Sequence, residues 1–167
     1  MKRSAMGLGN FKLEDTIRNQ VEDAAPESGG GDPTTKEWDW NSPFWRKLGA
    51  PWGGAHASAS DVARFLAEFL RPQGKTLKPE TARLMITNQN REGVTPRGLG
   101  FDIGTKAGGR RSSARTFGHS GSTGTLCWAD PATDTVCVVL TTLPMRALSP
   151  HPCRIVSDRV AEAVATT

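Results

Sequence analysis

The densest group of residues able to do chemistry is the run Gly118-His119-Ser120-Gly121-Ser122-Thr123-Gly124. It joins a titratable imidazole, three hydroxyls and three glycines within seven residues. An imidazole moves protons near neutral pH, and glycine lets a backbone amide come close to a substrate carbonyl. The same composition also suits a glycine-rich turn whose polar groups bond their own backbone. Local composition leaves both interpretations open.

Two other interpretations of this run do not fit. Gly118 to Ser122 approaches the Gly-x-Ser-x-Gly pattern of a nucleophile elbow, but its fifth position is serine, and the expected flanks are two strands rather than a strand and a helix. A phosphate-binding loop would need a Gly-Lys-Ser/Thr ending and a following helix, and the run has neither. We therefore exclude both.

The elements around this run predict an α+β fold. One helix is expected after an N-cap at Ser58 or Ser60, with an apolar stripe from Val62 to Leu70, and another begins at Pro79 and runs toward Asn88. Strands are then expected, followed by a closing helix, over the ranges 98–104, 115–119, 124–129, 135–142 and 149–165. The last two strands form a hairpin around residues 130–134. The pattern indicates an antiparallel sheet of at least three strands packed with helices.

The N-terminal third has a different character. Residues 1–20 carry a helical pattern that suits either a short helix or a loop, and the stretch from Ala24 to Trp52 is rich in Pro and Gly yet holds four of the five tryptophans. Buried indoles predict packing as core or lid, or a wall facing a substrate. We expect an irregular segment over residues 1–52, with a short helix, and a second unit over residues 53–167.

Composition excludes several classes of protein. The chain has 167 residues, 37% hydrophobic, and a mean hydropathy of −0.43, without an apolar run of the roughly 18 residues that span a bilayer. The net charge of +4 does not favour nucleic acid, and the basic stretch 108–115 lacks the aromatic residues that stack on bases. Three cysteines argue against a disulfide framework and favour a reducing compartment such as the cytoplasm; no signal peptide is evident.

No metal or cofactor is expected. His151-Pro152-Cys153 and His56 are the residues that suggest a metal, but no Cys-x2-Cys or His-x3-His pair accompanies them. We expect these side chains to serve packing or to lie at the surface.

The order of features resembles the C-terminal portion of the serine β-lactamase-related hydrolases, which include class C β-lactamases, D-alanyl-D-alanine carboxypeptidases and esterases. The resembling features cover about residues 40–165. In order they are Pro51 to Phe65, Leu99-Gly100-Phe101, Phe117 to Gly124, the Asp130-Pro131 hairpin and the strand from Val136 to Leu143.

This resemblance implies a site on the strand that bears the family's Lys/His-x-Gly motif. It assigns His119 and Gly121 to that motif and the Ser122 amide to one of two oxyanion donors. His119 with Ser120 would hold a substrate carboxylate or polarise the proton network. The implied reaction is hydrolysis of a small amide or ester through an acyl-enzyme.

One departure from the family is decisive for activity. The family needs Ser-x-x-Lys, yet the residues three before each lysine are Gly9, Pro33, Phe44, Pro72, Lys75 and Ile103, and Lys2 has none; tyrosine is also absent. We therefore expect the C-terminal half of a longer hydrolase, inactive alone and prone to self-association through exposed apolar faces. The alternative is a binding or interaction module that keeps the fold without catalysis.

Overall fold

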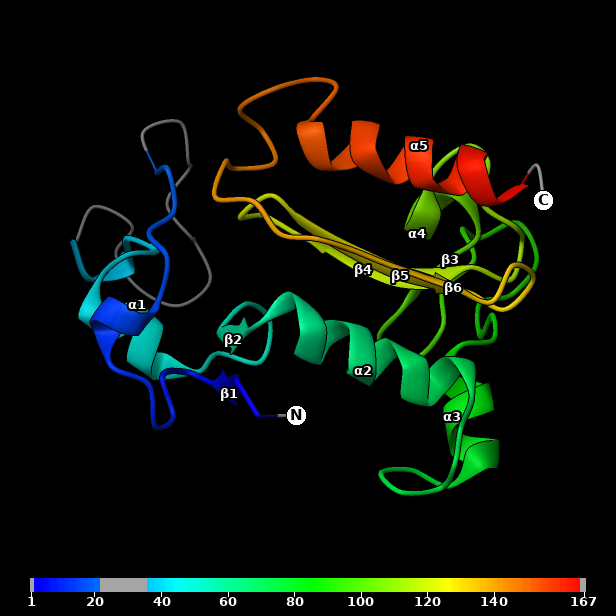
Figure 1. Cartoon of the computed structure of the whole chain (residues 1–167), viewed down its shortest axis with the longest axis horizontal. Helices are drawn as coiled ribbons and strands as arrows, with labels where there is room; N and C mark the ends of the chain where they lie inside the picture. Colours follow the sequence, from blue (N-terminus) through cyan, green and yellow to red (C-terminus); the bar gives the residue numbers. More distant parts are fainter. Residues whose placement is uncertain (1, 22–35, 166–167) are drawn as a thin grey trace.

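A four-stranded antiparallel sheet lies between helices in the computed structural model, which describes residues 2–21 and 36–165. Helix α5 covers one face of the sheet, and α2 covers the other, with α3 beside it (Figure 1). The strands are β1 (Ser4–Met6), β2 (Ala55–Ala57), β3 (Asp102–Ile103), β4 (Phe117–Gly121), β5 (Thr125–Asp130) and β6 (Thr135–Val139). The helices are α1 (Pro43–Leu48), α2 (Ala59–Leu70), α3 (Pro79–Met85), α4 (Thr105–Gly108) and α5 (Pro152–Ala165), with 3-10 turns at Leu13–Asp15 and Lys36–Trp38.

The sheet order is β3-β4-β5-β6, with every neighbouring pair antiparallel. The β5–β6 hairpin closes at the Asp130–Thr135 pair, where Asp134 takes a left-handed backbone with φ of 52°. Aspartate tolerates that conformation better than most residues, which explains the turn at the expected place. The predicted α+β fold with an antiparallel sheet is confirmed.

Each face of the sheet has its own core. On the α2 face, Leu66 and Phe69 pack against Phe101 and Phe117. Phe69, Phe101 and Phe117 meet edge to face, with ring centroids 5.0 to 6.4 Å apart. On the α5 face, the core consists of Leu126, Trp128, Cys137, Cys153 and Ala161. These two cores hold β4 and β5 between the helices.

The N-terminal residues join the fold by a strand rather than by a helix. β1 pairs antiparallel with β2, so that Ser4 lies opposite Ala57. The buried Asp61 carboxylate accepts hydrogen bonds from the Lys2 and Arg3 amides at 2.7 and 2.6 Å. The sequence allowed a short helix or a loop over residues 1–20, and the structure has β1, loop and the 3-10 turn Leu13–Asp15 there, because this long-range pairing outweighs a weak local periodicity.

The expected strand over residues 98–104 shrinks to β3. Gly100 and Gly104 have φ of +85° and +68°, and such left-handed backbone interrupts a strand.

The N-cap of α2 is Ser58, whose Oγ accepts from the Asp61 amide at 3.3 Å. Among the described helices, none is both long and apolar enough to cross a membrane.

Candidate active site

β4 carries His119, Ser120 and Gly121, and β3 covers only the first part of the β4 edge that faces away from β5. β3 pairs only with Phe117 and Gly118, so it ends before His119. From His119 to Gly121, β4 pairs with β5 on one edge, and no strand among the described residues pairs with its other edge. An open strand edge offers unpaired backbone groups to another chain or to a ligand.

His119 is held by two contacts. Arg97 Nη2 lies 3.0 Å from His119 Nε2, and His119 Nδ1 lies 2.8 Å from the Ser120 carbonyl oxygen. A guanidinium can only donate, so Nε2 accepts and Nδ1 carries the hydrogen that is donated to Ser120. The two contacts fit the tautomer with the hydrogen on Nδ1.

Cations gather around this part of β4. The buried Asp102 carboxylate pairs with Arg97 at 2.7 Å and with Lys106 at 3.0 Å. Neighbouring strand residues face opposite sides of a sheet, so Ser120 faces α5, where Arg154 Nη2 donates to its hydroxyl at 3.3 Å. One carboxylate among three cations leaves the site electropositive.

The turn after β4 holds the Ser122 amide. Gly124 N donates to Gly121 O at 3.0 Å, and Met145 N donates to Ser122 O at 2.9 Å. Gly124 has φ of +81°, and a β-carbon there would collide with the Leu143 carbonyl oxygen, so only glycine fits. In the described part of the chain, the Ser122 N–H has no acceptor. The flanking carbonyls of Gly121 and Ser122 are thus hydrogen-bonded, whereas the amide between them is not paired with any described residue.

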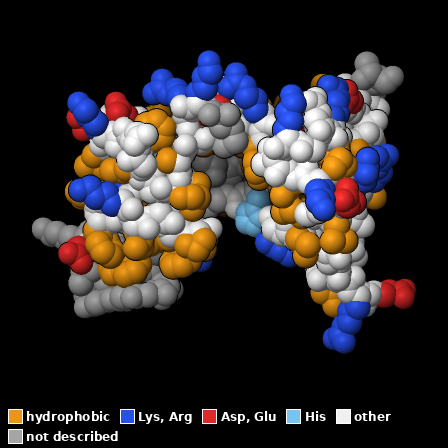
Figure 2. Space-filling model, turned by 90° about the horizontal axis from the view of Figure 1, so that it is seen from below, with side chains coloured by type: hydrophobic (Ala, Val, Ile, Leu, Met, Phe, Trp, Pro, Cys, Tyr) orange, Lys and Arg blue, Asp and Glu red, His pale blue; other side chains and the backbone are white. Residues whose placement is uncertain are grey.

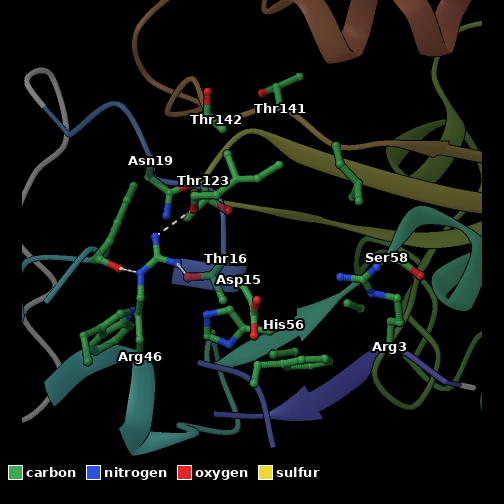
Figure 3. Close-up of a pocket in the computed structure, with 18 of the residues that line it drawn as sticks. Arg3, Asp15, Thr16, Asn19, Arg46, His56, Ser58, Thr123, Thr141 and Thr142 are labelled. Atoms are coloured by element: carbon green, nitrogen blue, oxygen red, sulfur yellow. Dashed lines mark hydrogen bonds between the residues drawn. The ribbon is translucent and has the colours of Figure 1, made fainter. Parts of the chain in front are cut away.

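A cavity of about 600 Å³ lies next to this turn. Arg46 of α1 and His56 of β2 lie on one side of it, and Thr123, Thr141 and Thr142 lie on the other (Figure 3). Figure 2 shows the hollow between the N-terminal part and the part that bears the sheet.

Burial shifts the pKa values of two side chains that line this cavity, Arg46 and His56. It lowers the pKa of Arg46, and the nearby Arg18 lowers it further, against Asp39, which raises it. Burial also lowers the pKa of His56 below its usual range, against a hydrogen bond to Gly7 O that raises it; the Arg46 charge adds to the lowering. Both cationic forms are thus disfavoured by their surroundings.

The histidine and cysteine near α5 make internal contacts. His151 is buried, with Nδ1 3.0 Å from Cys153 Sγ and Nε2 3.0 Å from Leu143 O. His56 Nδ1 lies 3.0 Å from Gly7 O. These contacts give each imidazole a packing role, and no cluster of three or more metal-binding side chains occurs within residues 2–21 and 36–165.

Sequence reasoning missed the arginines at both places. Arg97 and Arg154 reach β4 from a loop and from α5, and Arg46 enters the cavity from α1. Arginine is common on surfaces, so only the tertiary structure distinguishes these three from solvated ones.

Comparison with known proteins identifies the family. The Beta-lactamase family model matches residues 5–151, so the chain belongs to the beta-lactamase family. This confirms the resemblance drawn from the ordered features around β4. No curated protein matches the chain.

Two solved structures share the fold. A beta-lactamase from Mycobacterium bovis is 30% identical over 67% of this chain and 46% of its own length, with a TM-score of 0.52. EstA from Arthrobacter nitroguajacolicus is 20% identical over 98% of this chain and 50% of its own, with a TM-score of 0.57. The chain thus spans about half the length of each.

Proposed function

We propose that this chain supplies the substrate-binding strand of a serine hydrolase that cleaves amide or ester bonds. The nucleophile would come from a Ser-x-x-Lys segment outside these 167 residues, since none occurs within them. The serine oxygen adds to the substrate carbonyl carbon and its proton passes to a base. The carbonyl oxygen then becomes an oxyanion, and its collapse expels the amine or alcohol and leaves an acyl-enzyme that water hydrolyses.

The observation that carries the proposal is the Ser122 N–H, which has no acceptor among the described residues and lies at the end of an open strand edge. A fixed backbone donor that needs no rearrangement stabilises an oxyanion better than water does. The Gly124 and Met145 hydrogen bonds hold both flanking carbonyls of the turn in place. Gly121, without a side chain, leaves room for the substrate to approach this edge.

His119 and Ser120 would orient the substrate. Arg97 and the Ser120 carbonyl fix the imidazole on one side of β4, and Arg154 contacts the Ser120 hydroxyl on the other. The surrounding positive charge favours a substrate with a carboxylate near the scissile bond. In this proposal, no residue of this chain acts as the nucleophile.

The test is complementation. The purified chain is mixed with the polypeptide encoded upstream, provided that it carries Ser-x-x-Lys, and turnover of nitrocefin and p-nitrophenyl butyrate is measured. We expect turnover only from the mixture, and a clear loss with His119→Ala. Arg110→Ala, in the exposed basic stretch, is the control that keeps the rate.

The Ser122 donor is tested by a matched pair of variants. Ser122→Ala keeps the backbone N–H and should retain most activity, whereas Ser122→Pro removes it and should lower kcat by about 10²- to 10³-fold. Circular dichroism of both variants checks the fold. Equal rates for the pair, or hydrolysis by the chain alone, would contradict the proposal.

A further inference from the structure

The cavity of about 600 Å³ is a second place in the molecule with room for a ligand. It lies between the N-terminal segment and the β4–β5 turn, and His119 is not among the residues that line it. Its volume falls within the range of pockets that enclose a small organic molecule.

Arg46 is the unusual residue of this cavity. Its side chain comes from a residue only 4% exposed, yet no carboxylate lies within ion-pair distance among the described residues. All its recorded hydrogen bonds go to neutral acceptors: Trp40 O at 3.1 Å, Ile17 O at 2.9 Å, Asn41 Oδ1 at 2.8 Å and the Thr16 hydroxyl. The charge of Asp39 reaches Arg46 and raises its pKa, but no described carboxylate forms a direct ion pair with the guanidinium. A buried charge without such a pair is costly, so the site favours an anion.

The N–H donors of Arg46 also favour an anion as the ligand. A guanidinium has five N–H groups, and the four bonds above leave one, on Nη1, without an acceptor in the described chain. Thr123 also lines the cavity, and its hydroxyl has no hydrogen-bond partner within residues 2–21 and 36–165. Figure 3 shows both Arg46 and Thr123 at this cavity.

The remaining lining defines the rest of the ligand. Arg3 adds a cationic group, whereas Nδ1 of His56 already contacts Gly7 O at 3.0 Å. The one acidic residue among those that line the cavity, Asp15, already accepts the Lys12 amide at 2.9 Å. Apolar and aromatic side chains complete the wall, namely Phe11, Trp40, Trp45 and Leu140. A ligand that matches this lining has a flat apolar body and one negative group.

We propose that this cavity binds a small amphipathic carboxylate, with its carboxylate on Arg46 and Thr123 and its apolar body against Trp40 and Trp45. A carboxylate suits a guanidinium because both are planar and because charge-assisted bonds are the strongest available. The site needs no nucleophile, so it is independent of the hydrolase proposal and can be tested on the chain alone.

The experiment compares two ligands that differ only in charge. Phenylacetate and its neutral isostere phenylacetamide are titrated into the purified chain, and binding is followed by calorimetry and by tryptophan fluorescence. We expect one saturable site for phenylacetate and at least about tenfold weaker binding of phenylacetamide, since the charged bond is lost.

Three variants locate the site. Arg46→Gln should abolish phenylacetate binding, and Thr123→Val should weaken it several-fold. Arg18→Gln removes the same charge from an exposed residue that does not line the cavity, so binding should persist. Thr123→Val keeps the test decisive if Arg46→Gln does not fold. Equal binding of both ligands, retained binding in a folded Arg46→Gln variant, full-strength binding in Thr123→Val, or no saturable binding at all would overturn the proposal.

Discussion

Asp130, at the end of β5, provides a quantitative test of how the strands that carry the site are held. Its buried carboxylate accepts four hydrogen bonds: from the Ser113 amide and hydroxyl at 3.0 and 2.6 Å, the Thr116 hydroxyl at 2.7 Å and the Ala132 amide at 2.8 Å. In Asp130→Asn, the new NH₂ must face either the Ser113 or the Ala132 amide, because each carboxylate oxygen accepts one of them. An orphaned buried donor costs about 1–3 kcal/mol, and bonds to a charged acceptor are stronger still. We therefore expect a loss of about 2–4 kcal/mol.

The pKa of Asp130 predicts in which direction its contribution to stability changes with pH. Burial alone would raise the pKa of Asp130, but the hydrogen bonds from Ser113, Thr116 and Ala132 outweigh it and leave the pKa below its ordinary value. As the pH falls, the Asp130 carboxylate therefore takes up a proton at a higher pH in the unfolded chain than in the folded one. The contribution of the carboxylate is complete above about pH 4, the unfolded value, and is lost as the pH falls through the folded value.

The assay is urea unfolding followed by tryptophan fluorescence at pH 7 and at successively lower pH. Asp134→Asn is the matched control: its carboxylate pairs with Arg71 at the surface, so the change should stay below about 1 kcal/mol. The difference between wild type and Asp130→Asn should shrink at acid pH. A difference below about 0.5 kcal/mol at pH 7, or one independent of pH, would refute the reasoning.

Three further changes probe the strand, its turn and its support. Arg97→Gln should free Nε2 of His119 and let the imidazole change tautomer, seen as a shift of its ring ¹⁵N signals; unchanged signals would argue against the contact. Gly124→Ala should destabilise by more than about 1–2 kcal/mol in thermal unfolding, since left-handed backbone and a collision with a carbonyl add up; a neutral effect would mean that the turn differs. Ser157→Ala leaves the buried Trp128 N–H, now bonded at 2.8 Å, without its partner and should cost about 1–3 kcal/mol in urea unfolding, with no loss as the contrary result.

Local signals explain which elements were predictable. Ser58 caps α2, and Pro79 begins α3, because a side-chain cap and a proline at the first helical turn act within a few residues. The hairpin at residues 130–134 follows from the cluster of turn residues between the two strands. Such features need no knowledge of the rest of the fold.

The features that the sequence left open or did not reveal depend on distant contacts. β1 forms only because β2, about fifty residues later, offers an edge to pair with. The exposed fraction of Ile17 is 78%, so the apolar period expected to make a helix there does not mark a buried face. The cation–histidine contact of Arg97 and the burial of Arg46 likewise arise from tertiary packing, which no local pattern encodes.

The measurement that tests the central claim most directly is a crystal structure of the chain with the Ser-x-x-Lys polypeptide and an aryl boronic acid. The boronate bonded to the serine mimics the tetrahedral intermediate. We predict one boronate oxygen at about 3 Å from Ser122 N, along the open edge of β4. A boronate placed away from this edge, with the Ser122 N–H bonded to protein, would contradict the assignment of this chain as the substrate-binding strand.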